Sequence, residues 1–207
     1  MTTPAASASL ADAQLELLRR MAALDPAPCL IGGFAEDALL AGAVTRPHVD
    51  VDWMVPRREL PLRLAQAREL GFDDFETWGE SAPGQPFYLC AENGELKLEV
   101  GVADDQDGRV YVKIHKLAFD IDGREPPAGY QLLLPRESFE HPLVEIDGVA
   151  VRTASPLTLY QLRTGIASQG SFGPLSTQQR ESARRLKERF FPLISDADLA
   201  PRIEPLT

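Results

Sequence analysis

Two aspartates separated by a single valine interrupt an apolar segment, and they limit how this chain can fold. Residues 49–55 read VDVDWMV, an alternation that predicts a strand. One side of this strand would carry Val49, Val51 and Trp53, and the other Asp50, Asp52 and Met54. An ionised carboxylate among apolar neighbours is costly unless a cation or hydrogen bonds compensate it. The pattern therefore predicts a binding site at Asp50 and Asp52.

A third carboxylate lies on the strand predicted over residues 95–103, where Lys97 and Glu99 share one side. Pairing between distant strands can bring Glu99 alongside Asp50 and Asp52. Three carboxylates without a neighbouring His or Cys cluster form a hard oxygen site, which suits Mg²⁺ rather than zinc. Because Mg²⁺ usually keeps positions for water and substrate phosphates, this site predicts a nucleotide ligand.

Gly32 and Gly33 end a short apolar strand predicted over residues 28–33 and precede a helix predicted over 34–42. The N–H groups and the positive dipole end of a helix N-terminus bind phosphate. Glycine lets the backbone come close to such a ligand without a Cβ in the way. Gly-Gly and Asp-x-Asp are each weak signals. Their succession along one chain is a stronger indication of a nucleotide site.

The composition of the chain disfavours some classes of binding partner. The 207 residues are 44% apolar and 25% charged, with a formal net charge of −10. This charge disfavours nucleic acid, which needs Lys and Arg along the phosphates, and suits divalent cations or a polycationic small molecule. No apolar run approaches the ~20 residues of a membrane helix, and the first residues lack a secretory-signal pattern. Cys29 and Cys90 predict no disulfide, so we expect a cytoplasmic protein without membrane contact.

The predicted elements give an α+β fold in two parts, with a boundary near residue 154. Helices are predicted over residues 9–24, 34–42, 57–72, 155–168 and 177–191. Further strands are predicted over residues 86–93, 109–114 and 130–135, with a loop over 79–86. Turn signals at Asn93-Gly94 and Asp147-Gly148 predict two hairpins. Ser155 and Pro156 predict the start of a C-terminal helical region over residues 155–207.

The segments LIGGFAEDALLAG and TRPHVDVDWMV, which cover much of residues 30–55, resemble the opening of the nucleotidyltransferase superfamily with the DNA polymerase β-type palm. More narrowly, they resemble the aminoglycoside and lincosamide nucleotidyltransferases. Those proteins have Gly-Gly-aromatic-Ala-x-Asp, followed by Thr-Arg-x-His-x-Asp-x-Asp. The matching positions are Gly32, Gly33, Phe34, Ala35, Asp37, Thr45, Arg46, His48, Asp50 and Asp52. A looser similarity continues through residues 98–111 and from residue 147 onward.

The resemblance implies a mixed β-sheet palm with flanking helices over residues 1–154, followed by the helical region. It implies a nucleoside triphosphate, ATP in the first instance, with its triphosphate over Gly32 and Gly33 and Mg²⁺ on Asp50 and Asp52. An acceptor hydroxyl would attack the α-phosphorus in line and release pyrophosphate. Glu99 would be either a metal ligand or the general base.

Several other residues are candidates with an ordinary structural alternative. Arg46 and His48 are assigned to nucleotide binding, although Arg46 is also compatible with a surface cation and His48 with a role in orienting the aspartate loop. Asp37, Lys97, Tyr160 and Arg163 are candidates for supporting contacts or contacts to nucleotide or acceptor. For Asp37 a structural role is favoured, and a core tyrosine beside a surface arginine explains Tyr160 and Arg163 equally well.

The leading functional hypothesis is an enzyme that transfers a nucleoside monophosphate to a hydroxyl of a small molecule, such as an aminoglycoside- or lincosamide-like antibiotic. One alternative is a nucleotidyltransferase toxin with a protein acceptor. Another is a catalytically silent nucleotide-binding module, which the three retained acids disfavour. A template-directed polymerase is disfavoured by the acidic charge.

Overall fold

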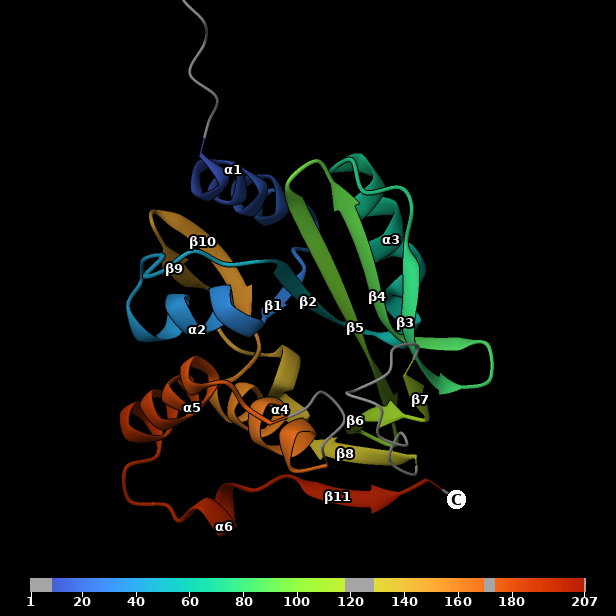
Figure 1. Cartoon of the computed structure of the whole chain (residues 1–207), viewed down its shortest axis with the longest axis vertical. Helices are drawn as coiled ribbons and strands as arrows, with labels where there is room; N and C mark the ends of the chain where they lie inside the picture. The colour runs from blue at the N-terminus through green and yellow to red at the C-terminus, as the bar shows by residue number, and fades with distance from the viewer. Residues whose placement is uncertain (1–8, 118–128, 170–173, 207) are drawn as a thin grey trace, which may run out of the picture.

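A mixed β-sheet runs through the computed structural model, which describes residues 9–117, 129–169 and 174–206. Within these residues the main path of the sheet is β11-β8-β6-β5-β2-β1-β10-β9, and β3, β4 and β7 form a branch from β5 (Figure 1). The pairs β2–β5 and β1–β10 are parallel, and the other pairs are antiparallel. The predicted α+β class, a mixed sheet with flanking helices, is confirmed.

The strands are β1 (Cys29–Ile31), β2 (Val51–Pro56), β3 (Glu76–Ala82), β4 (Gln85–Asn93), β5 (Leu96–Gln106), β6 (Arg109–Ile114), β7 (Lys116–Leu117), β8 (Tyr130–Leu134), β9 (Val144–Ile146), β10 (Val149–Thr153) and β11 (Arg202–Pro205). The α-helices are α1 (Leu10–Ala22), α2 (Gly32–Leu40), α3 (Leu60–Glu69), α4 (Pro156–Ser168), α5 (Thr177–Phe190) and α6 (Asp196–Leu199). Short 3₁₀ turns cover Arg57–Glu59 and Arg136–Phe139. Within the described residues, no helix is long and apolar enough to cross a membrane.

Several predicted boundaries differ from the structure. The loop expected over residues 79–86 is wrong, because β3 and β4 form a hairpin whose turn is Pro83 and Gly84. Little in the sequence indicated β3, because it contains Gly79 and glycine is uncommon in strands. In the structure, the ring of Phe87 occupies the space where a side chain at Gly79 would lie. The helix after the glycines begins at Gly32, two residues earlier than predicted.

Local signals elsewhere are confirmed. Asp147 and Gly148 have φ of 46° and 76° and connect β9 to β10, as a two-residue hairpin requires. Ser155 accepts a hydrogen bond from the backbone N–H of Thr158, and Pro156 is the first residue of α4. The turn between β4 and β5 lies one residue later in the chain than the predicted turn at Asn93-Gly94, because Asn93 pairs with Leu96.

The period-two pattern of β2 separates the core from the site. Val51, Trp53 and Val55 are fully buried and belong to the main hydrophobic core. The prediction that Val49 shares this side is wrong, because Val49 precedes β2 and is exposed. Asp52 and Met54 on the other side line a cavity. The strand that carries the acids is therefore anchored in the core by Trp53, the largest fully buried side chain among the described residues, and by two valines.

The C-terminal region stays in close contact with the rest of the chain, and its division from residues 1–154 remains a prediction. β11 pairs with β8, and both α4 and α5 contact α2 (Figure 1). Helix α4 lies tightly against β8, since a Cβ on Gly165 would be 2.5 Å from Leu132.

We expect a chain that ends at Ala154 to lose cooperative unfolding. Truncation would remove α4 and β11 and expose Leu132 and Leu134 of β8, which are 0% and 3% exposed in the full chain. Thermal unfolding followed by circular dichroism and tryptophan fluorescence would measure the effect. A truncated chain with one sharp transition in both signals would contradict this expectation.

Candidate active site

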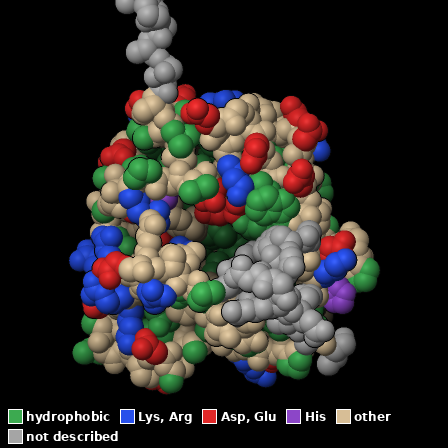
Figure 2. All heavy atoms as spheres, viewed as in Figure 1, with side chains coloured by type: hydrophobic (Ala, Val, Ile, Leu, Met, Phe, Trp, Pro, Cys, Tyr) green, Lys and Arg blue, Asp and Glu red, His purple; other side chains and the backbone are tan. Residues whose placement is uncertain are grey.

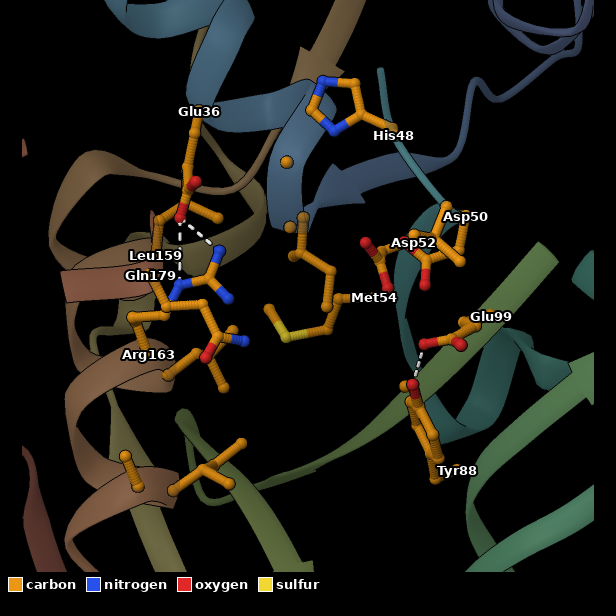
Figure 3. Close-up of a pocket in the computed structure, with 18 of the residues that line it drawn as sticks. Glu36, His48, Asp50, Asp52, Met54, Tyr88, Glu99, Leu159, Arg163 and Gln179 are labelled. Carbon is orange, nitrogen blue, oxygen red and sulfur yellow. Dashed lines mark hydrogen bonds and ion pairs between the residues drawn. The ribbon is translucent and has the colours of Figure 1, made fainter. Parts of the chain in front are cut away.

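Three carboxylates from two neighbouring strands meet at one point. Asp50 directly precedes β2, Asp52 lies within it, and Glu99 lies in β5. Parallel pairing makes Asp52 and Glu99 direct register partners. One oxygen from each of the three carboxylates lies within 4.8 Å of the others (Figure 3). The structure thus brings together the three acids that the sequence singled out.

The electrostatics of this cluster favour a cation. Burial raises the pKa of Asp52 to about 7, and the negative charge of Asp50 adds to this effect. Burial likewise raises the pKa of Glu99 to about 9, followed by the charges of Asp52 and Asp50. A bound divalent cation would favour the ionised form of both carboxyl groups and so oppose both shifts. The donor set consists of oxygen atoms alone, which fits Mg²⁺.

Glu99 is held by neighbours on both sides. The hydroxyl of Tyr88 on β4 donates to Oε2 (Figure 3). The ammonium group of Lys97 contacts Oε1. Lys97 also lies 4.4 Å from the centre of the Trp78 ring. The carboxylate is therefore fixed beside Asp52 by both hydrogen bonding and charge. Tyr88 gave no signal in the sequence, because its proximity to Glu99 depends on strand register.

The two glycines let functional side chains reach the backbone. Gly32 has φ of +65°, and a Cβ there would lie 1.9 Å from Oδ2 of Asp52. A Cβ on Gly33 would lie 2.2 Å from Nδ1 of His48 and 3.0 Å from Nη2 of Arg46. Side chains of this protein thus fill the space that the sequence analysis reserved for a ligand. The N-terminus of α2 still lies directly beside the acids.

The loop that leads to Asp50 is fixed by Asp37 on α2. Asp37 accepts hydrogen bonds from the backbone N–H and hydroxyl of Thr45, at 2.8 and 2.6 Å, and lies 2.9 Å from Nε2 of His48. Arg46 can only donate to Nδ1 of His48, so Nε2 carries the hydrogen and donates to Asp37. Burial raises the pKa of Asp37, but the hydrogen bonds from His48 and Thr45 outweigh it and lower the pKa. These contacts give Asp37 and His48 an orienting position.

The acids open onto a cavity of about 420 Å³, within the size range of ligand sites. Figure 2 shows a hollow on this face, with hydrophobic side chains in its depth and acidic side chains beside it. The cavity lies between the sheet and the C-terminal helices. Apolar residues of its lining include Met54, Phe87, Val112, Leu159, Leu162 and Ile166.

Only some of the other candidate residues from the sequence line the cavity. Arg46 and Arg163 line the cavity, whereas Lys97 reaches the site through Glu99. Tyr160 is absent from the lining, because its hydroxyl donates to Asp196 and its ring lies among other buried residues of the C-terminal region. Sequence reasoning missed Glu36, which lines the cavity beside Arg163. Its position four residues after Gly32 on a helix was an available signal.

Comparison with known proteins identifies the fold. No protein-family model matches this chain, and no curated protein matches its sequence. Its structure is similar to a crystal structure of ANT(2'')-Ia, an aminoglycoside nucleotidyltransferase, in complex with adenylyl-2''-tobramycin. The TM-score is 0.58 at 23% identity, covering 85% of this chain and 88% of the other. A solution structure of the antibiotic-resistance factor ANT(2'')-Ia gives a TM-score of 0.54 at 24% identity, covering 85% and 83%.

This chain has a nucleotidyltransferase fold. The predicted resemblance is therefore confirmed at the level of the fold. Within the nucleotidyltransferase fold of this chain, Asp50, Asp52 and Glu99 lie where β2 and β5 run side by side, next to the N-terminus of α2.

Gly32→Ala is expected to displace the Asp52 carboxylate and weaken Mg²⁺ binding by about 10–100-fold, as for other residues that orient metal ligands. Gly84→Ala is the matched control, because Gly84 has φ of +71° but no atom within 4 Å of a Cβ. Both variants carry similar backbone strain. Calorimetric Mg²⁺ titration compares them, and equal affinities would show that Gly32 does not position Asp52.

Asp52→Asn is expected to stabilise the protein in EDTA at pH 8. Between the ordinary carboxyl pKa near 4.5 and the raised value of about 9, the folded state keeps a proton on Glu99 that the unfolded state releases. The unfolding free energy therefore falls as the pH rises through this window. Removing the charge of Asp52 should raise the free energy of unfolding by roughly 1–2 kcal/mol. This corresponds to a rise of about 2–8 °C in the unfolding midpoint.

Differential scanning calorimetry at pH 5 and pH 8 measures this effect, which should be smaller at pH 5. Mg²⁺ should raise the midpoint of the wild-type protein more at pH 8 than at pH 5, and should do little for the variant. Asp73→Asn, at an exposed position, controls for the loss of a negative charge. A variant that is less stable than wild type in EDTA at pH 8 would contradict the repulsion described here.

Proposed function

We propose that this protein is a magnesium-dependent nucleotidyltransferase, which transfers a nucleoside monophosphate from a triphosphate to a hydroxyl of a small molecule. ATP is the proposed donor and AMP the transferred group. The observation that carries this proposal is the meeting of Asp50, Asp52 and Glu99 within 4.8 Å beside the N-terminus of α2. The likeness in fold to an aminoglycoside nucleotidyltransferase supports it.

In the proposed reaction, Asp50 and Asp52 hold Mg²⁺, with Glu99 as a third ligand or as the base. When bound, the ion neutralises phosphate charge and supplies electrostatic stabilisation of the transferred group. The N–H groups at the start of α2, at Gly32 and Gly33, face the anionic tail of the donor. Arg46, with its guanidinium against the Gly33 backbone, adds a positive charge there.

The acceptor hydroxyl must lose its proton as its oxygen attacks the α-phosphorus and the bond to pyrophosphate breaks. In the role of base, the ionised Glu99 takes this proton, which requires its carboxylate to lie within hydrogen-bond reach of the acceptor hydroxyl. Tyr88 and Lys97 keep its two oxygens in place. In the role of metal ligand, Glu99 instead completes the carboxylate set around the ion.

A small-molecule antibiotic is the proposed acceptor class. The solved neighbour is in complex with adenylyl-2''-tobramycin, and it is described as an antibiotic-resistance factor. The net charge of −10 suits a cationic compound such as an aminoglycoside, and a lincosamide-like compound is a second candidate. Nucleic acid and membrane are not part of the proposal, and the cytoplasm is the proposed location.

Pyrophosphate release is the direct test. Each of the four nucleoside triphosphates is incubated with Mg²⁺ and a panel of hydroxyl-bearing antibiotics. We expect release with ATP and at least one acceptor, and a loss of about 10³-fold or more for Asp52→Asn, because a charge that stabilises the transition state is removed. Circular dichroism verifies that the variant is folded. A folded Asp52→Asn variant with wild-type turnover would refute the role of Asp52.

Radiolabelled ATP separates the proposal from its alternatives. Label on a small molecule supports the proposal, whereas label on a polypeptide would indicate a protein-modifying toxin. Magnesium-dependent ATP binding without pyrophosphate release under any condition would indicate a catalytically silent module.

A further inference from the structure

The cavity needs cations beyond Mg²⁺ if a polyphosphate is to bind there. The polyphosphate of a nucleotide is strongly anionic, and three carboxylates already occupy one wall. Among the described residues that line the cavity, the Lys and Arg residues are Arg46 and Arg163. Arg46 precedes the Asp-x-Asp strand, but Arg163 comes from α4, in the C-terminal region. Figure 3 shows Arg163 on one side of the cavity and Asp52 and Glu99 on the other.

The guanidinium of Arg163 is fixed by a single buried carboxylate. Its Nε and Nη2 atoms donate to Oε1 of Glu36 at 3.1 and 2.5 Å. The side chain of Glu36 is 3% exposed and that of Arg163 is 18% exposed. An arginine has five N–H donors, and within the described chain the hydrogen bonds of Arg163 involve two of its nitrogen atoms. The hydrogens of Nη1 are therefore available to a ligand.

Glu36 does not neutralise both of its cationic neighbours. Its Oε2 lies 3.9 Å from Nη2 of Arg46 and has no hydrogen-bond partner among the described residues. One carboxylate thus faces two guanidinium groups, which leaves this wall of the cavity with a net positive charge. An anion that bound here would gain attraction from both arginines and would meet only one fixed negative charge.

The surroundings of Arg163 strengthen this attraction. Leu159, Leu162 and Ile166 lie on the same face of α4 and line the cavity on both sides of the arginine. Apolar neighbours lower the local dielectric, so that a charge acts more strongly there than in water. A guanidinium also matches the geometry of phosphate oxygens, which it binds through two parallel N–H groups.

We propose that Arg163 binds the polyphosphate of the donor nucleotide, and that Glu36 positions its guanidinium at the cavity wall. This inference rests on the proposed function, and it adds helix α4 to the nucleotide site. Under this proposal, the C-terminal helices complete the binding site that the glycine turn and the acidic strands begin.

Inorganic tripolyphosphate and ATP, each with Mg²⁺, are the probes for the test. Replacing Arg163 alone would leave Glu36 buried and unpaired, which can unfold a protein. The comparison is therefore made between Glu36→Gln and the double variant Glu36→Gln, Arg163→Gln. We expect the double variant to bind both probes about 10–100-fold more weakly than Glu36→Gln by isothermal titration calorimetry, the range for hydrogen bonds to charged groups.

Two further variants make the result specific. Arg189→Gln removes the same charge from an exposed position on α5 and should leave both affinities unchanged. Glu36→Gln, Arg163→Lys keeps the charge without the planar fork and should recover part of the affinity, which a merely structural role would not produce.

The outcomes distinguish this inference from the proposed function. Equal affinities for Glu36→Gln and its Arg163→Gln derivative would overturn the role of Arg163, even if the enzyme transfers nucleotides. Failure of the wild-type protein to bind either probe would overturn it as well. A loss of binding in the double variant supports the role of Arg163, even if the wild-type protein releases no pyrophosphate with any acceptor.

Discussion

Mutual repulsion among three carboxylates is the constraint around which this structure is organised. Two of them are held together by the parallel register of β2 and β5, which places Glu99 directly beside Asp52. The strands cannot relax this contact, because Val51, Trp53 and Val55 anchor β2 in the core. The repulsion is therefore retained in the folded protein, where burial and then this repulsion raise the pKa of both carboxyl groups. A divalent cation bound between the carboxylates would offset this repulsion.

The rest of the site follows from the need to hold these acids in place. Gly32 provides room for the Asp52 carboxylate, and Gly33 provides room for the ring of His48. Asp37 then fixes the loop that leads to Asp50, through hydrogen bonds with Thr45 and His48. The motif that resembles nucleotidyltransferases is thus a set of interlocking contacts, in which each residue occupies the space that another leaves open.

Features governed by near neighbours in the chain were predictable from sequence. The alternation around Asp52, the turn at Asp147 and the helix cap at Ser155 each depend on a few adjacent residues. Strand β11 was not predictable, because it is short and polar and is stabilised by pairing with β8 at the edge of the sheet. The proximity of Glu99 to Asp52 was an expectation that only the strand register could establish.

Glu36 shows why the charge of the site could not be read from the motif alone. Its partner Arg163 lies far along the chain, and the register of α2 against α4 brings the two together. This contact gives the cavity an acidic wall on the sheet and a cationic wall on the helices. A polyphosphate bound to a divalent cation offers a cation, which the carboxylates would attract, and free phosphate oxygens, which the arginines would attract. The two walls would therefore favour one orientation of such a ligand, with its metal toward Asp52 and its free phosphate oxygens toward Arg46 and Arg163.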